Sequence, residues 1–193
     1  DSEIVELPGL GPSGAGPLFS RNGRFLAVMY WPGHGYSHGL RMWKLDGAEP
    51  VMPVDEATQV TTCNFSPDGR LFAFGVEAGP ISLIELPSGR LLRRLDVGRL
   101  PLSLIFHPQE PQFAVTINRA AIHVCEQDTG TLVVKFPEPN GVDDLAWHPE
   151  GKTLAAVGFD RKIHLWDVTT GKPSWVLEGL QNGGIRPVFN HSG

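Results

Sequence analysis

The chain has 193 residues and a formal net charge of −5, so it is long enough for one domain with a sizeable core. The acidic balance argues against nucleic acid or an anionic membrane as the main partner. No apolar run approaches the roughly 18 residues that a membrane-spanning helix needs, and the first residues lack the basic and apolar regions of a signal peptide. Cys63 and Cys125 have neither metal-site nor redox-pair spacing and are expected to be reduced core thiols. We therefore expect no cofactor or metal, and a cytoplasmic location.

Along the chain, one pattern of four short strands is repeated four times. The first strand ends at an aromatic residue before a tight turn, as in Phe65-Ser-Pro-Asp-Gly-Arg70, because Pro, Asp and Gly supply the angles and cap of a turn. The second strand is almost wholly apolar, which indicates burial on both faces. The third runs into another turn, as in Leu165-Trp-Asp-Val-Thr-Thr-Gly171, and the fourth is shorter and more exposed. No segment has a useful helical period.

Two features of this pattern keep the same spacing. The strand-end aromatics are 46, 41, 41 and 42 residues apart, at Phe19, Phe65, Phe106, Trp147 and Phe189. The corresponding third-strand positions are each 41 residues apart, at Trp43, Ile84, Cys125 and Trp166. A period of about 40 to 45 residues with four strands per unit is typical of a β-propeller blade.

The two quoted motifs resemble those of the WD-repeat β-propeller family, and the resemblance covers essentially the whole chain. It implies that Trp166 packs within its blade and joins a hydrogen-bonded set with Asp160 and a His between blades. Trp43 is the counterpart of Trp166 in the first repeat. No position where that His is expected holds one, so we expect apolar packing to replace the polar set, with irregular blades at Ile84 and Cys125.

A closer resemblance involves residues 145–167, which are similar to repeats in large bacterial proteins that carry a Ser/Thr protein kinase domain before a propeller. Neither a His-Arg-Asp nor an Asp-Phe-Gly sequence occurs in the chain. Any kinase activity would therefore belong to sequence outside these 193 residues.

The expected fold is all-β, with residues 1–193 forming a β-propeller segment of four-stranded antiparallel blades. Four full blades are expected at about 16–54, 60–97, 102–137 and 143–178. Residues 1–9 resemble the outer strand of a preceding blade, and residues 185–193 the inner strand of a following one. Closed propellers have about 4 to 8 blades, and an open arc exposes long edges. We expect part of a larger ring, for example of seven blades; the alternative is a ring closed by the chain itself or by a second copy.

Partner-binding candidates are placed on loops that the resemblance assigns to the top face of the propeller. The first repeat has an insertion between its second and third strands that contains Trp31, His34, Tyr36 and His38. Aromatic anchors of this kind dominate interface energetics, although Trp31 could instead complete the second strand. Further candidates follow from register: Glu77, Asn118, Phe159, Asp144 and Arg186. This mixed, mildly acidic surface suits a basic or amphipathic peptide.

No catalytic set is assigned. Asp143 and Asp144 form a carboxylate pair in sequence, but neighbours on a strand point to opposite faces. His107 and His148 fill the slot that Ser occupies in the first two repeats, which predicts a turn-stabilising hydrogen bond. We expect a non-catalytic protein–protein interaction scaffold within a larger signalling or regulatory protein. The alternative is a propeller enzyme or small-ligand binder with a site at the central channel.

Overall fold

The computed structural model describes residues 13–31, 39–53, 59–137, 141–180 and 186–190. In this part of the chain all regular structure is β, and no helix is long and apolar enough to cross a membrane. The strands form four antiparallel sheets, each built from four consecutive strands. The predicted all-β fold with four four-stranded blades is confirmed.

Each sheet follows the same strand order. The first contains β1 (Ser13–Phe19), β2 (Phe25–Trp31), β3 (Gly39–Lys44) and β4 (Glu49–Pro53). The second contains β5 (Val60–Phe65), β6 (Leu71–Val76), β7 (Ile81–Glu85) and β8 (Leu91–Leu95). The third contains β9 (Pro101–Phe106), β10 (Gln112–Ile117), β11 (Ala121–Glu126) and β12 (Leu132–Pro137). The fourth contains β13 (Asp144–Trp147), β14 (Thr153–Val157), β15 (Ile163–Asp167) and β16 (Lys172–Leu177).

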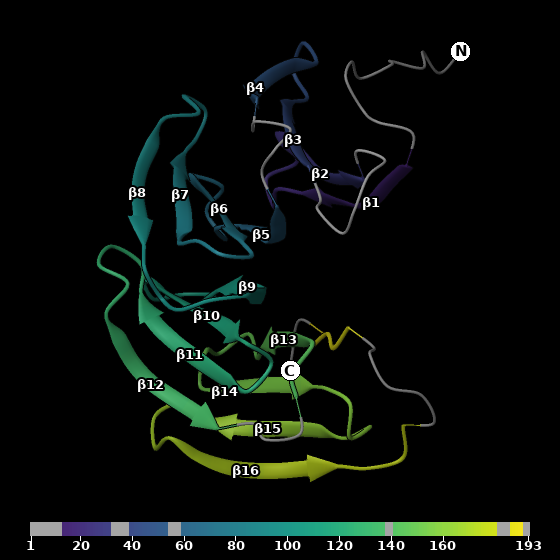
Figure 1. The fold of residues 1–193 in the computed structure, drawn as a ribbon, viewed down its shortest axis with the longest axis vertical. Coiled ribbons are helices and arrows are strands. Elements are labelled where there is room, and N and C mark those ends of the chain that lie inside the picture. Colours follow the sequence, from purple (N-terminus) through teal and green to yellow (C-terminus); the bar gives the residue numbers. More distant parts are fainter. Residues whose placement is uncertain (1–12, 32–38, 54–58, 138–140, 181–185, 191–193) are drawn as a thin grey trace.

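The four sheets are arranged as an arc (Figure 1). Strands β1, β5, β9 and β13 lie toward the inside of the arc, and β4, β8, β12 and β16 lie on its outside. Along the inside, β5 contacts β9 and β9 contacts β13. The first strands therefore line one concave surface.

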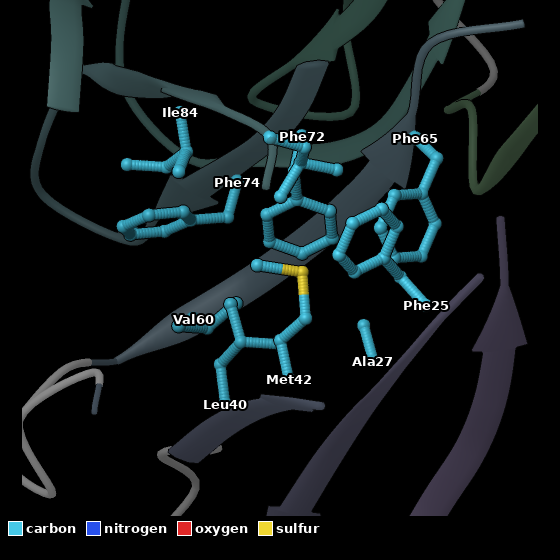
Figure 2. Close-up of a cluster of buried hydrophobic side chains, with 10 residues drawn as sticks. Phe25, Ala27, Leu40, Met42, Val60, Phe65, Phe72, Phe74 and Ile84 are labelled. Atoms are coloured by element: carbon cyan, nitrogen blue, oxygen red, sulfur yellow. The ribbon is translucent and has the colours of Figure 1, made fainter. Parts of the chain in front are cut away.

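The hydrophobic core is divided into layers between neighbouring sheets. The layer between the first two sheets includes Phe25, Met42, Phe65 and Phe72, whose side chains converge in Figure 2. Equivalent layers lie between the second and third sheets and between the third and fourth. In β10, Phe113 and Val115 belong to one layer whereas the intervening Ala114 belongs to the next. This division explains why the second strands are apolar at almost every position.

Side chains close the turns after the strand-end aromatics Phe19, Phe65 and Phe106, and the one at His107 was predicted. The hydroxyl oxygen of Ser20 accepts a 2.9 Å hydrogen bond from the backbone N–H of Phe25, and Ser66 does the same for Leu71. His107 fills this slot in the third repeat, where its Nδ1 accepts the backbone N–H groups of Gln109 at 3.1 Å and Glu110 at 2.8 Å. Ser and His can both stabilise this turn because the side chain of each accepts hydrogen bonds from backbone N–H groups a few residues away.

The expectation of irregular blades at Ile84 and Cys125 is wrong. All four sheets have a register shift between their third and fourth strands at this same position, including those with Trp43 and Trp166. Ile84 and Cys125 are buried, as are the two tryptophans. An apolar side chain of any of these sizes can therefore fill the slot.

The sequence also predicts a strand at each terminus of the chain. Residues 1–9, one of these segments, lie outside the described residues. Residues 186–190 belong to the segment expected to begin a further blade, but they have no strand assignment. A first strand needs a second strand as its hydrogen-bonding partner, and the described residues contain none for this segment.

Candidate interaction surface

The turns at one end of the blades are tied together by backbone hydrogen bonds. The N–H of Leu100 donates to the carbonyl of Glu77 at 2.9 Å, and the N–H of Asn118 donates to the carbonyl of Leu100 at 3.1 Å. The N–H of Val142 donates to the carbonyl of Arg119 at 3.0 Å. The first and third of these bonds join the turn after one second strand to the connection entering the next blade, and the Asn118–Leu100 bond ties that connection to the turn of its own blade. We call this end of the blades the top face.

An exposed aromatic ring and a guanidinium meet on the top face. Arg119, in the β10–β11 turn, places its guanidinium carbon 5.1 Å from the centre of the Phe159 ring, in the β14–β15 turn. The Nε of Arg119 lies 3.9 Å from a carboxylate oxygen of Asp143. Phe159 is 56% exposed, so its ring is available to a ligand although the guanidinium covers part of it.

Two glycines allow this close approach. A Cβ at Gly141 would lie 2.8 Å from a ring carbon of Phe159, inside van der Waals contact. Gly158, directly before Phe159, faces the carbonyl of Gly141 so closely that a Cβ would overlap its oxygen. The sequence thus brings the β14–β15 turn against the segment that enters the fourth sheet.

A second polar group follows the inside of the arc. The hydroxyl of Ser103 donates to one carboxylate oxygen of Asp144 at 2.7 Å, and the Nε of Arg186 donates to the other at 3.2 Å. Thr62, Ser103, Asp144 and Arg186 hold the same place in successive repeats, so these contacts link three repeats. All four line a hollow of about 860 Å³ on the concave surface. Asp143 and Asp144 therefore contact different partners.

The predicted partner-binding residues fall into three groups. His34, Tyr36 and His38 lie outside the described residues, and Trp31 ends β2 with a side chain that is not described. Glu77, Asn118 and Phe159 are exposed in equivalent turns. Asp144 and Arg186 are paired with each other on the concave side. The structure thus brings Phe159 together with Arg119 and Asp143, and Asp144 together with Arg186.

Arg119 was missed by the reasoning from sequence. It occupies the register position that Asp160 occupies in the next repeat, so the available signal was a cation at the place of the turn aspartate. Its backbone is left-handed, with φ of +57°, as is that of Asn118 at +55°. Left-handed non-glycine residues are uncommon and often mark turns of special purpose.

The polar set implied for the fourth sheet is built differently from the family pattern. Asp160 accepts the backbone N–H of Lys162 at 3.1 Å and lies 2.7 Å from Nε2 of His164. That histidine comes from β15 of the same blade and not from the connection between blades. Trp166 is buried and its ring centre lies 5.0 Å from that of Phe136 in the third sheet. Trp43 is buried with Leu26 and Val28 in a small cluster.

Comparison with known proteins agrees with this architecture. Residues 130–167, from the β11–β12 turn to the end of β15, match the family model described as "WD domain, G-beta repeat". This assignment supports the WD-repeat family for the chain.

Three curated relatives extend the match beyond one repeat. Periodic tryptophan protein 2 of Saccharomyces cerevisiae is 26% identical over 116 residues, covering 58% of this chain and 13% of that protein. Cross-pathway control WD-repeat protein 2 of Flammulina velutipes is 26% identical over 147 residues, covering 70% and 46%. Telomerase protein component 1 of Rattus norvegicus is 30% identical over 159 residues, covering 80% and 6%. The chain thus spans less than half the length of each of these relatives.

These relatives are eukaryotic, and none is named as a protein kinase. The resemblance to bacterial kinase propellers stays a prediction. Within the described residues, no group of three or more His, Cys, Asp or Glu side chains is placed to hold a metal ion.

Proposed function

We propose that this chain is a non-catalytic protein–protein interaction platform, a scaffold module of the WD-repeat type within a larger signalling or regulatory protein. WD-repeat proteins generally serve as interaction scaffolds, and the family match and the relatives support that role. The proposal places the larger protein in the cytoplasm, in keeping with the free thiols of Cys63 and Cys125.

The observation that carries the proposal is the exposed ring of Phe159 on a fixed top face. A large aromatic side chain loses little conformational entropy on binding and buries much area, so it is a good interface anchor. The inter-turn hydrogen bonds hold its surroundings in place before a partner arrives. Loops on a rigid scaffold are the usual place for recognition.

We also propose that the fourth sheet is covered by a further blade, which would continue the ring. The second and third sheets each turn an equivalent apolar set toward the next sheet: Ala73, Ile81, Leu83 and Leu95, then Ala114, Ile122, Val124 and Phe136. The matching set in the fourth sheet is Ala155, Ile163, Leu165 and Leu177. Leu177 is 47% exposed, and Trp175, which pairs with Leu165, is 70% exposed. Such a face normally requires a second apolar layer.

Residues 186–190 already make the contacts of the next first strand. The ring of His107 meets that of Trp147 edge-on at 4.6 Å, and His148 meets Phe189 in the same way at 5.1 Å. The pairing of Asp144 with Arg186 continues the row that begins at Ser103. The further blade would come from the same polypeptide or from another copy.

The platform proposal is tested by quantitative cross-linking capture with the complete protein that contains this chain. Phe159→Ala combined with Arg119→Gln is expected to lose specific partners that the unchanged protein captures. Arg90→Gln is the matched control, because it also removes an arginine–carboxylate pair, with Glu85, but on the outer edge. If the double variant captured the same partners as the unchanged protein, or if the control lost them to the same extent, the proposal would be contradicted.

A second candidate function is favoured by the polar row on the concave surface. Ser103, Asp144 and Arg186 could hold a small polar ligand in the hollow near the central axis. This second function predicts that Asp144→Asn abolishes the binding of such a ligand, or abolishes a hydrolytic activity at this site. Partner capture through Phe159 should be unchanged in the same variant. A screen of small polar metabolites by thermal shift, with the Asp144 variant beside the unchanged protein, separates the two functions.

A further inference from the structure

We propose that the Arg119–Phe159 pair recognises an acidic peptide segment in which a carboxylate side chain stands next to an apolar one. This inference rests on the proposed platform function and names the chemistry of its partner. It differs from the basic or amphipathic peptide that the sequence favours. The difference arises because the acidic groups on this part of the molecule are already engaged.

The guanidinium of Arg119 is held from two sides. The Phe159 ring lies against its face at 5.1 Å, and the Asp143 carboxylate lies beside its Nε at 3.9 Å. No described residue accepts a hydrogen bond from its two terminal amino groups, and the side chain is half exposed. Those amino groups form a fork that matches a carboxylate in geometry. The arrangement leaves these amino groups available to an external carboxylate.

The surrounding charges favour an anionic ligand. Asp143 is engaged by Arg119, and Asp144 is engaged by Arg186 and Ser103. Arg99, in the connection next to Asn118, and Arg161, in the same turn as Phe159, are both exposed. Neither has an ion-pair partner among the described residues. The exposed carboxylates of Glu77 and Asp96 lie beside Arg99, because Asp96 belongs to the same connection and the N–H of Leu100 donates to the carbonyl of Glu77. The exposed arginines beside the Phe159 ring are therefore Arg119 and Arg161.

The apolar half of the site is the exposed ring of Phe159. The ring packs close to Gly141, where an added Cβ would lie 2.8 Å from a ring carbon, so a larger residue there would displace it. A leucine or aromatic side chain next to the ligand's carboxylate would cover the ring while the carboxylate meets Arg119. Covering the ring also removes water from the ion pair, which strengthens it.

The backbone of the site is set before binding. Arg119 and Arg161 both have left-handed φ angles, of +57° and +60°. The carbonyl of Arg119 accepts the N–H of Val142, and the N–H of Ala120 donates to the carbonyl of Ile117 at 3.0 Å. A guanidinium whose backbone is already held in place loses less conformational entropy when it binds a ligand.

The test is selection of a displayed random heptapeptide library on the purified complete protein that contains this chain, followed by affinity measurement of the selected peptides by fluorescence polarisation. We expect Asp or Glu next to Leu, Phe, Tyr or Trp in the selected peptides. Arg119→Gln and Phe159→Ala are each expected to weaken binding at least tenfold, and Arg119→Lys to restore only part of the loss. Arg90→Gln, which breaks the pair with Glu85 across the β7–β8 turn, should leave affinity unchanged. Circular dichroism of each variant verifies that the sheets are intact.

The outcomes separate this inference from the platform function. If the selected peptides were basic and their binding depended on Phe159, the inferred acidic ligand would be wrong, and the proposed interaction platform would still be supported. Peptides that bind equally to the Arg119 and Phe159 variants would overturn both. Failure to select any peptide that depends on Arg119 overturns the inference as well.

Discussion

The Nε2 of His107 lies 2.9 Å from the carbonyl oxygen of Gly151, across the junction between the third and fourth sheets. Because Nδ1 of the same ring accepts two backbone N–H groups, the proton is assigned to Nε2, which donates to Gly151. The buried imidazole of His107 thus forms hydrogen bonds both within its own turn and to the turn of the next blade. Gly151 is required there, since a Cβ would meet the imidazole ring.

Replacement of His107 by Ala should therefore destabilise the chain by about 2 to 3 kcal/mol, because it leaves buried backbone donors and an acceptor without partners. The measurement is urea unfolding followed by circular dichroism. His148→Ala is the matched comparison: its ring is less buried and accepts one backbone N–H, that of Glu150, at 3.2 Å. A loss below about 1 kcal/mol is expected there. Equal losses for both variants would contradict a special inter-sheet role for His107.

Leu177 and Phe136 occupy the same register position in the fourth and third sheets but differ in burial, at 47% and 0% exposed. Phe136→Ala is expected to cost about 3 to 5 kcal/mol because it empties a core layer. Leu177→Ala should cost less than about 1 kcal/mol in this chain, since little apolar surface is lost from a buried layer. In the complete protein, where we propose that a further blade covers the fourth sheet, Leu177→Ala should reduce the free energy of unfolding by more than it does in this chain. The same small loss in the complete protein would contradict the proposed blade.

Gly158→Ala should displace the β14–β15 turn, because the new methyl group would overlap the carbonyl of Gly141. We expect a loss of about 2 kcal/mol or more, by analogy with overpacked interiors, and weaker binding through Phe159. Gly23→Ala separates this effect from simple backbone strain: its φ is +67° but no atom lies near the added group. That variant should lose about 1 kcal/mol. If Gly158→Ala were the milder of the two, the proposed close approach would be wrong.

The two thiols should react slowly in the folded protein, Cys125 because it is buried and Cys63, which is only partly buried and lines the hollow, because its thiolate is disfavoured. Burial raises the pKa of Cys63 from 9.0 to about 12, a rise that the nearby charge of Arg186 partly opposes. Burial and the charge of Glu126 raise the pKa of Cys125 to about 11. At pH 8 a disulfide reagent should label neither thiol rapidly, and both should react once the chain is unfolded.

The same shifts predict a loss of stability at high pH. Both pKa values are higher in the folded state, so the unfolded chain releases its thiol protons first as the pH rises above about 9. The contribution is fully present below pH 9 and declines as the pH rises toward 11 to 12. Cys63→Ser combined with Cys125→Ser should flatten the decline in urea unfolding between pH 8.5 and 10.5. A slope unchanged by these substitutions would contradict the assignment.

The repeat could be predicted from sequence because its causes are local. Apolar second strands, the turn after Phe65 and the Thr-Gly turn after Trp166 fix strand order and length through backbone preferences and side-chain periodicity. The same regularity predicts the hydrogen bond of His107 within its turn, since Ser66 shows what that slot requires. Strands, turns and four sheets were therefore determined by the sequence itself.

The contacts between sheets were decided by the tertiary structure. The pairing of Arg119 with Phe159 joins turns 40 residues apart, and that of Asp144 with Arg186 joins residues 42 apart. Their distances depend on how two twisted sheets pack and on the small space at Gly141 and Gly158. Sequence register could select Asn118 and Phe159 as candidates, but it could not show that the neighbouring Arg119 turns onto the ring. Local pattern fixes which residues share a face, whereas the packing of one sheet on the next fixes which of them meet.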